Sequence, residues 1–315
     1  MLRSSSTAFP PENGPQSAAS SKQGMGYATF AYVFWGFAPV YFVWAAFATP
    51  AEILAHRIVW SVPMLLALVW FAGMFHEFRS LGGAALQRLV VCSILLTINW
   101  LTFIYAISES RIAETALGYF INPLISIVLG RFLLGEPMRP LQWVAAGLAA
   151  TGVLIELAWM GSVPILALIL AVSFGFYGLL RKGVAVSSPV GLSVETLVVV
   201  PFALGYILFV ELNATRLPYG LGQYAYLALG GLVTITPLLA FGAAARRLPL
   251  TVIGFFQYIA PSLSLILAIV VYDEAVSTAR WVNLSFIWFA LLLFTAESLF
   301  HYRRSQRMEF PSQTS

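Results

Sequence analysis

Charge is scarce in this sequence: 10% of its 315 residues are charged, whereas 60% are hydrophobic. A soluble domain is about one-quarter charged, so this composition excludes an ordinary soluble protein. The apolar stretches are long and continuous, as a membrane-spanning helix of roughly 20 residues requires. They do not alternate with period two, which argues against an outer-membrane barrel. The composition therefore predicts an all-α integral membrane protein.

Motifs for catalysis and cofactor binding are also lacking. Lysine occurs only as Lys22 and Lys182, and there is no G-x-x-x-x-G-K-[ST] phosphate loop. The motifs H-E-x-x-H and G-x-S-x-G are absent, and the histidines, at 56, 76 and 301, are too dispersed to predict a metal site. We therefore expect a protein that is neither an enzyme nor an ATP-driven pump, with no cofactor and no metal.

The cysteine and the cations set two further limits. The single Cys92 lies in an apolar run, so no disulfide framework is predicted. The formal net charge is +4, but Arg and Lys occur mainly as pairs between apolar runs and form no basic face for nucleic acid. The expected partners are a small-molecule solute and the lipid bilayer, with the chain a monomer or a weak homodimer.

Ten apolar segments, bounded by charges, prolines and glycines, are predicted to be transmembrane helices. They span residues 25–48, 51–74, 86–107, 113–134, 141–159, 162–180, 191–210, 223–245, 252–272 and 281–300. Residues 1–24 are rich in Ser, Pro, Gly and Ala and lack the pattern of a signal peptide. We predict disordered cytoplasmic tails at 1–24 and 303–315.

The cations are divided unevenly between the two sides of the membrane. If the N-terminus is cytoplasmic, Arg57, Arg111, Arg216 and Arg280 fall on the outer side and the rest of the 17 cations fall on the inner side. Loops rich in Arg and Lys face the cytoplasm. Both termini are therefore predicted to be cytoplasmic.

The sequence also carries a weak internal repeat. Landmarks coincide at a shift of 138 residues, where Pro123 falls on Pro261, Glu136 on Glu274, Trp143 on Trp281 and Val144 on Val282. A shift of 139 sets Trp35-Gly36-Phe37 against Phe174-Gly175-Phe176, and Pro50 against Pro189. The repeat predicts two five-helix halves, residues 25–160 and 161–302. Because five is odd, the second half enters the membrane from the opposite side, and such an inverted 5+5 repeat is typical of transporters.

Several motifs together carry a family resemblance. PAEILAHRIVWS (50–61), NWLTFIYA (99–106), ALGYFINPLISIVLG (116–130) and GFFQYIAP (254–261) resemble the RarD family of bacterial permeases, within the EamA-type exporters of the drug/metabolite transporter superfamily. The resemblance covers residues 25 to 300 and implies a ten-helix bundle in the bacterial inner membrane. The family name is attached to chloramphenicol sensitivity, but the resemblance supplies no natural substrate.

The first candidate site lies at the start of the 51–74 segment, which carries Glu52, His56, Arg57 and Trp60. His56 and Trp60 are four residues apart and so share a helix face. An ionisable group within a span is a functional candidate by default. His56, Arg57 and Trp60 are therefore candidates to bind a carboxylate or phosphate, or to gate the outer mouth. The alternative is an interfacial cluster whose long side chains reach the headgroups.

Glu195 is the candidate for proton coupling. It aligns with His56 at the 139-residue shift, so the inverted repeat predicts it on the inner side of the midplane, opposite His56. A carboxylate there could take up and release a proton during transport. The alternative is an interfacial Glu paired with Arg181 or Lys182.

Uncharged polar and aromatic residues recur at mirrored places in both halves. The substrate-binding candidates among them are Asn99, Trp100, Tyr119, Asn122, Gln257 and Tyr258. Pro123 and Pro261 are predicted to break their helices and free backbone carbonyls. Amides and aromatic faces beside a kink suit a solute with polar and flat apolar parts. The alternative is interhelical hydrogen bonding, worth about 0.6 kcal/mol per bond.

Two carboxylates and a run of alanines have structural interpretations. Glu156 and Glu297 lie near helix ends and are predicted to be interfacial. Small residues at 145, 146, 149 and 150 allow close approach of helices, either inside the bundle or at a dimer face.

The predicted function is a secondary transporter that exports small metabolites or drug-like solutes, facilitated or proton-coupled. An importer of the same architecture remains an alternative, because the sequence does not fix direction. A membrane receptor or assembly factor is another, but the loops between the spans are short. An intramembrane hydrolase would need a pair such as Ser126 and His56, and no motif links the two.

Overall fold

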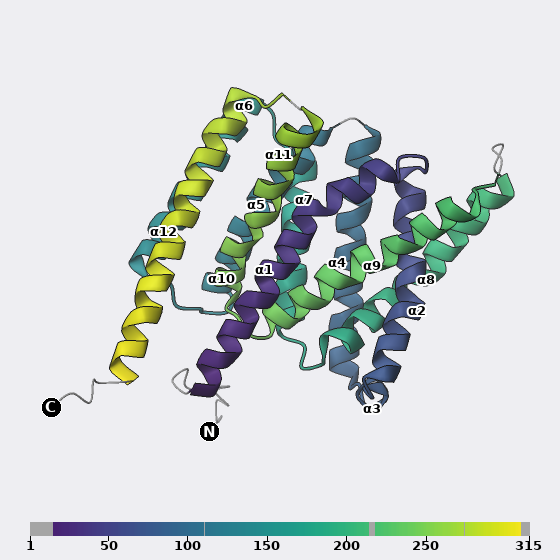
Figure 1. Cartoon of the computed structure of the whole chain (residues 1–315), viewed down its shortest axis with the longest axis horizontal. Coiled ribbons are helices and arrows are strands. Elements are labelled where there is room, and N and C mark those ends of the chain that lie inside the picture. Colours follow the sequence, from purple (N-terminus) through teal and green to yellow (C-terminus); the bar gives the residue numbers. More distant parts are fainter. Residues whose placement is uncertain (1–14, 110, 214–217, 274, 310–315) are drawn as a thin grey trace, which may run out of the picture.

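The computed structural model describes residues 15–109, 111–213, 218–273 and 275–309, and these segments form helices joined by short turns (Figure 1). The helices are α1 (Pro15–Trp44), α2 (Pro50–Phe71), α3 (Phe75–Arg79), α4 (Gly83–Ser108), α5 (Ile112–Phe132), α6 (Pro140–Met160), α7 (Ile165–Lys182), α8 (Ser188–Asn213), α9 (Leu221–Ala245), α10 (Leu250–Gln257), α11 (Ile259–Tyr272) and α12 (Thr278–Glu309).

Within the described segments, nine stretches are long and apolar enough to cross a membrane. They comprise α2, α4 to α9, the α10–α11 pair taken as Leu250–Tyr272, and α12 as far as Ser298. Large apolar side chains are exposed on the outside, including Phe71 (86%), Phe202 (77%) and Leu212 (76%). A water-soluble monomer rarely exposes so much apolar surface, whereas lipid tails cover it without cost. The protein is an all-α, multi-pass membrane protein.

The helix boundaries differ from the predicted ones mainly at the two ends of the chain. Helix α1 begins at Pro15 rather than at residue 25, so the prediction of a disordered tail is wrong for residues 15–24. Proline suits the first helical turn, and the Ala, Lys and Gln that follow favour helix. Helix α12 likewise runs on to Glu309, past the predicted boundary at 302. The rest of the predicted tails, residues 1–14 and 310–315, lies outside the described residues.

The helices pack mainly across the predicted boundary between the halves. Helix α6 packs on α12, α5 packs on α7 and α10, and α2 packs on both α8 and α9. Helix α1 packs on α9 and α11, and α4 packs on α7. One apolar core joins α1, α2, α4, α7 and α9, and a second joins α5, α6 and α12. Both ends of the described chain lie at the same end of the bundle (Figure 1).

Small residues allow the closest of these helix contacts. A Cβ on Gly118 of α5 would lie 3.1 Å from the Ala167 carbonyl oxygen of α7. Ala145, Ala146 and Ala149 of α6 are buried in the same core as the inner face of α12. Close backbone approach through small side chains is the usual way in which helices associate in lipid. The alanines of α6 therefore pack inside the bundle.

Candidate functional site

A small cavity lies among α2, α4, α8 and α9, two helices from each predicted half. Its volume is about 10 Å³, close to the minimum that holds one water molecule. The residues that line it are Ile58, Ser61, Ser93, Leu96, Thr97, Trp100, Leu192, Glu195, Thr196, Val199, Thr234, Ile235 and Leu238. The polar lining within an apolar bundle makes this cavity the candidate site.

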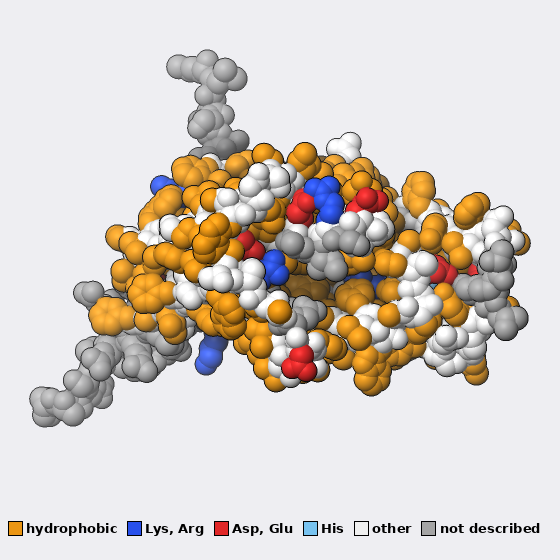
Figure 2. All heavy atoms as spheres, turned by 90° about the horizontal axis from the view of Figure 1, so that it is seen from above, with side chains coloured by type: hydrophobic (Ala, Val, Ile, Leu, Met, Phe, Trp, Pro, Cys, Tyr) orange, Lys and Arg blue, Asp and Glu red, His pale blue; other side chains and the backbone are white. Residues whose placement is uncertain are grey.

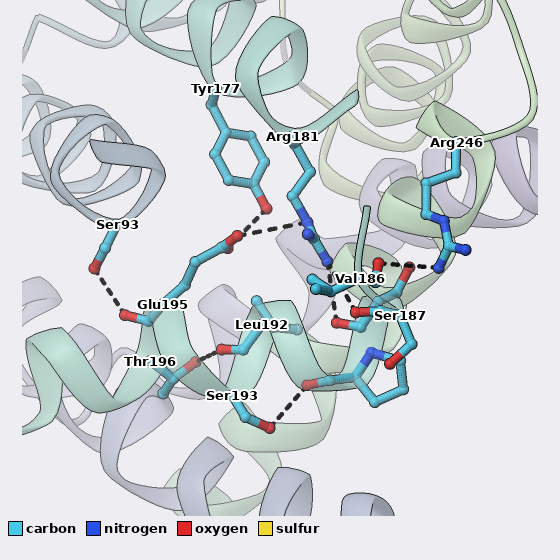
Figure 3. A network of polar contacts seen from close by, with 12 residues as sticks. Ser93, Tyr177, Arg181, Val186, Ser187, Leu192, Ser193, Glu195, Thr196 and Arg246 are labelled. Atoms are coloured by element: carbon cyan, nitrogen blue, oxygen red, sulfur yellow. Dashed lines mark hydrogen bonds and ion pairs between the residues drawn. The ribbon is translucent and has the colours of Figure 1, made fainter. Parts of the chain in front are cut away.

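Glu195 is the acidic residue of the cavity and belongs to a buried network of polar contacts (Figure 3). Its carboxylate accepts a hydrogen bond from Tyr177 Oη, 3.1 Å from Oε2, and Arg181 Nε lies 3.5 Å from Oε1. Ser93 Oγ of α4 donates to the Glu195 backbone oxygen at 2.7 Å. We call Ser93, Tyr177, Arg181 and Glu195 the Glu195 network. Each of its side chains is at most 2% exposed, so the network connects α4, α7 and α8 away from water.

The guanidinium of Arg181 is held against the beginning of α8. Arg181 Nη2 donates to the backbone oxygens of Ser187 and Ser188 at 3.5 and 3.2 Å (Figure 3). Gly191 makes room for it, because a Cβ there would lie 2.6 Å from Arg181 Cζ. The Ser187 carbonyl also accepts the Gly191 amide, so these are additional bonds, and they connect Arg181 of α7 to the start of α8.

Arg57 of α2 contacts two of the residues that line the cavity, Thr234 and Trp100. Its Nε donates to Thr234 Oγ1 of α9 at 2.8 Å. Its Cζ lies 5.1 Å from the centre of the Phe42 ring and 5.7 Å from that of Trp100, in the range of cation–π contacts. Thr234 and Trp100 line the cavity, so they separate Arg57 from the space next to Glu195.

Helix α9 is shaped to receive the Arg57 side chain. Thr234 Oγ1 donates its own hydrogen to the Gly230 backbone oxygen at 2.8 Å, which leaves its lone pairs directed at Arg57. A Cβ on Gly230 would lie 2.6 Å from Arg57 Cγ, so only glycine admits the stem of the arginine. We call Phe42, Arg57, Trp100, Gly230 and Thr234 the Arg57 site.

The other residues proposed at the start of α2 have different environments. Glu52 forms a capping box with Thr49 and accepts a hydrogen bond from Tyr219 Oη at 3.1 Å. His56 is buried, with its ring centre 6.1 Å from that of Tyr224. Trp60 is 38% exposed, although it shares a helix side with His56. The structure therefore brings Arg57, but not Trp60, next to the cavity.

The uncharged candidates are also divided. Asn99 Nδ2 donates to the Leu170 oxygen and to Ser173 Oγ of α7, at 2.9 and 3.1 Å, as the interhelical alternative expects. Gln257 Nε2 donates to Ser126 Oγ of α5 at 3.0 Å. Trp100 lines the cavity, and Tyr119 is 42% exposed.

Two of these candidates are buried with unused polar atoms. In the described part of the chain, Asn122 Oδ1 and Tyr258 Oη are buried and have no hydrogen-bond partner. Such atoms are costly in an apolar environment, so a water or a ligand group is needed to satisfy them.

The two prolines act differently. The ninth predicted span is divided at Tyr258, three residues before Pro261. A proline clashes with the carbonyl four residues earlier, here that of Gln257, which explains where α10 ends. Helix α5 continues without interruption through Pro123.

Reasoning from the sequence missed most of the Glu195 network and the α9 part of the Arg57 site. It considered an ion pair between Glu195 and Arg181, but at the membrane interface rather than buried. Lys182, the other proposed partner, lies 3.6 Å from Glu136 Oε1. Tyr177, Ser93, Gly230 and Thr234 carried no signal, because a single hydroxyl or glycine in an apolar run is common.

Glu156 and Glu297, predicted to be interfacial, are buried in the protein rather than directed at the headgroups, and their depth in the membrane stays a prediction. They are 5% and 4% exposed, and both are paired. Arg280 Nε of α12 lies 3.3 Å from Glu156 Oε1, and Arg139 Nη1, at the start of α6, lies 3.1 Å from Glu297 Oε1. Each arginine at the beginning of one helix thus neutralises a glutamate near the end of its antiparallel neighbour.

A second, larger groove of about 480 Å³ runs between α1 and α9. Its lining is apolar or aromatic and includes Phe30, Phe34, Phe37, Trp44 and Tyr226. Without an ionisable group it suits contact with lipid tails, and it is not a candidate for polar recognition.

Comparisons with known proteins agree with this architecture. Residues 22–157, which run from within α1 to within α6, match the EamA-like transporter family. The chain is 42% identical over 287 residues to an "Uncharacterized transporter" of Vibrio cholerae, covering 89% of this chain and 94% of that one. It is 40% identical over 296 residues to "Protein RarD" of Escherichia coli, covering 92% and 99%.

More distant relatives extend the match. "Protein RarD" of Streptomyces exfoliatus is 37% identical over 303 residues, covering 93% of this chain and 95% of the relative. A solved crystal structure with 19% identity superposes with a TM-score of 0.68 over 89% of this chain and 97% of the other, which shows a shared fold. With identities near 40% along almost the whole length of both chains, the protein belongs to the RarD family of EamA-like transporters.

Proposed function

We propose that this protein is a secondary transporter of the bacterial inner membrane that exports a small solute by alternating access. The observation that carries the proposal is the cavity among α2, α4, α8 and α9, because an acidic group from one half lines it and a cation from the other adjoins it. Ionisable groups at membrane depth mark the path of a solute or of protons. Transporters built from two repeats bind their solute between the repeats near the midplane.

Paired ionic contacts support two inverted five-helix halves, residues 25–160 and 161–302. Arg139 of α6 pairs with Glu297 of α12, and Arg280 of α12 pairs with Glu156 of α6. The same number of residues separates Arg139 from Arg280 as separates Glu156 from Glu297. Two such reciprocal contacts are what a two-fold axis between α6 and α12 would produce.

The helix neighbours support the same relation. If the two halves correspond, α4 is equivalent to α9 and α7 is equivalent to α1. The contact between α4 and α7 is then equivalent to the contact between α9 and α1, and both contacts exist. In the same way α5 is equivalent to the α10–α11 pair. The contact of α5 with α7 is then equivalent to the contact of the α10–α11 pair with α1, and both of these contacts also exist. In this arrangement α1 is the tenth span, in addition to the nine identified by length and hydropathy.

Topology and charge support cytoplasmic termini. Both ends of the described chain lie at one end of the bundle, as an even number of crossings requires (Figure 1). The predicted excess of Arg and Lys is on that side. The opposite face is hollowed near its centre, with hydrophobic side chains in the hollow (Figure 2). We interpret this as access from outside, while the Glu195 network closes the side of the termini.

Glu195 is our candidate for proton coupling. Arg181 Nη1 and Glu195 Oε1 are buried without hydrogen-bond partners in the described residues, so the pair is weaker than a bidentate contact. Protonation of Glu195 would remove the attraction and leave the hydrogen bonds to the Ser187 and Ser188 carbonyls as the contacts of Arg181 with the start of α8. This weaker link between α7 and α8 would let the beginning of α8 move and open the cavity toward the termini.

The test compares spent medium from bacteria expressing the wild type, Glu195→Gln or the control Glu109→Gln, at matched membrane expression. Glu109 is exposed at the end of α4, so it matches the chemical change away from the cavity. We expect a metabolite to accumulate outside cells with the wild type and with Glu109→Gln. With Glu195→Gln, export should fall and lose its dependence on external pH.

Two results would contradict parts of the proposal. If the metabolite is depleted from the medium faster by the wild type, the direction is import. If Glu195→Gln exports with an unchanged pH dependence, Glu195 does not couple protons, and transport is facilitated or coupled elsewhere.

A further inference from the structure

Arg57 differs from most of the other cations whose side chains the structure describes; Arg79 also contacts a ring, that of Phe75, but it lies in the short helix α3 outside the candidate spans. Its partners there are one hydroxyl and two aromatic rings, and no carboxylate lies within ion-pair distance. In contrast, carboxylates neutralise Arg111, Arg139, Arg181, Lys182 and Arg280. Arg88, Arg131, Arg246 and Arg247 donate to backbone carbonyls. Arg57 is therefore a cation within a span whose charge these contacts leave uncompensated.

The surroundings of Arg57 fix the side chain without neutralising it. Thr234 binds the Nε edge of the guanidinium, and Gly230 receives the stem. The terminal nitrogens Nη1 and Nη2 have no acceptor in the described part of the chain. These two nitrogens present parallel N–H donors, the geometry that binds both oxygens of a carboxylate or a phosphoryl group.

Aromatic groups from two helices surround the same guanidinium. Phe42 of α1 and Trp100 of α4 are its ring neighbours. The ring of Phe103 connects Phe42 to Tyr119, with centre distances of 6.4 and 6.2 Å. A ligand bound to Arg57 would therefore contact aromatic faces with the rest of its surface.

We propose that Arg57 binds the anionic group of the transported solute, and that this solute is a small organic anion with a flat apolar part. A half-buried cation in lipid needs compensation, and a bound anion supplies it without a permanent protein partner. Phe42 and Trp100 then receive the apolar part of the solute. The inference rests on the proposed transport function and names its substrate class.

The experiment uses purified full-length protein in nanodiscs and pairs of probes with the same ring. Benzoate and phenylphosphonate are the anionic probes, benzamide is the neutral one, and benzylamine is cationic. Binding is measured by isothermal titration calorimetry on the wild type, Arg57→Gln, Thr234→Val and the control Arg131→Gln. Arg131 donates to the Glu136 backbone oxygen at the end of α5, so its substitution removes one charge outside the site.

We expect an anionic probe to bind the wild type and Arg131→Gln at least tenfold more tightly than benzamide or benzylamine. Arg57→Gln should weaken that binding roughly ten- to a hundredfold, the range for a hydrogen bond to a charged group. Thr234→Val should weaken it several-fold, because the guanidinium loses its orientation. Thr234→Val also keeps the test valid if Arg57→Gln does not fold. Preference for carboxylate over phosphonate, or the reverse, then identifies the headgroup.

Anions that bind no more tightly than benzamide would overturn the substrate class, and so would tight binding that survives both Arg57→Gln and Thr234→Val. Failure of the transport function would look different. A benzoate counterflow measurement in proteoliposomes would then show no exchange even though benzoate binds through Arg57. If instead the wild type and Arg57→Gln exchange benzamide equally well, the protein is a transporter but Arg57 is not an anion-binding site.

Discussion

Arg57 and Glu195 lie at similar depths in their helices, α2 and α8, but have opposite charges and different surroundings. Each lies seven residues beyond the first residue of its helix, Pro50 in α2 and Ser188 in α8. At 1.5 Å per residue, both are about 10 Å along their helices, which enter the bundle from opposite ends. A cation from α2 and an anion from α8 thus lie next to one cavity, as the proposed inverted repeat would arrange them.

The two residues differ in whether neighbouring groups neutralise their charge. Glu195 is 2% exposed and has Arg181 and Tyr177 as partners from its own half. Arg57 is half-buried and, among the described residues, is held by neutral groups only, one of which is Thr234 of α9. A compensated charge stabilises the closed end of the bundle, whereas an uncompensated one is available to a ligand. The comparison therefore agrees with the two proposals, a closing function for the Glu195 network and a binding function for the Arg57 site.

The largest expected effect is on stability. Arg181→Leu leaves Glu195 buried without its cation, which should lower the free energy of unfolding by about 3–5 kcal/mol. Arg57→Leu loses one hydrogen bond and two cation–π contacts and should cost about 1–2 kcal/mol. Equilibrium unfolding in mixed micelles measures both.

A double variant serves as the control for this comparison. Arg181→Leu/Glu195→Leu removes both charges and should recover most of the stability that Arg181→Leu loses. If Arg57→Leu proves as destabilising as Arg181→Leu, Arg57 has a structural role like that of Arg181, and the contrast between the two sites is wrong.

A smaller and more selective effect is expected from substitution of Gly191 and Gly230, each of which packs directly against an arginine side chain. Gly191→Ala would put a Cβ 2.6 Å from Arg181 Cζ, and Gly230→Ala would put one 2.6 Å from Arg57 Cγ. Both variants overpack and should cost about 1–3 kcal/mol of stability. Only Gly230→Ala should also weaken benzoate binding, by about fivefold, because it displaces the Arg57 stem.

Gly222→Ala is the matched control, since open space surrounds that position on the same helix, α9. It should be neutral or stabilise the protein by up to about 1 kcal/mol. Calorimetric titration with benzoate, together with unfolding in micelles, distinguishes the variants. Equal losses of affinity in Gly191→Ala and Gly230→Ala would show that the two arginines act as one site.

The sequence was sufficient for the helices because the bilayer leaves few alternatives for an apolar run of that length. The start of α2 was readable too, since Thr49, Pro50 and Glu52 form a capping box with proline in the first turn. Partner choice was not readable. Neighbouring residues on a helix point about 100° apart, so a small rotation decides whether Arg181 or Lys182 meets Glu195.

Glu156 and Glu297 show a related limit. The prediction for each rests on its distance from its own helix end, where a long acidic side chain can reach water. Their partners, Arg280 and Arg139, lie at the beginning of the antiparallel neighbour. That pairing depends on how far α6 and α12 slide along one another, and no pattern within either helix encodes the offset.

The smallest expected effect concerns the two prolines and tests whether the halves move alike. The ninth span is divided at Tyr258, so Pro261→Ala restores a backbone donor and favours a continuous, stiffer helix. Helix α5 is already continuous through Pro123, and Gly254 of α10 packs so closely on it that a Cβ there would lie 2.8 Å from the Pro123 oxygen.

At saturating benzoate, Pro261→Ala should slow counterflow in proteoliposomes about two- to fivefold, with affinity within twofold of wild type. Pro123→Ala should slow it less. Equal slowing by both would mean that the two helices bend to the same extent during transport, and that the difference between α5 and the α10–α11 pair belongs to this one conformation.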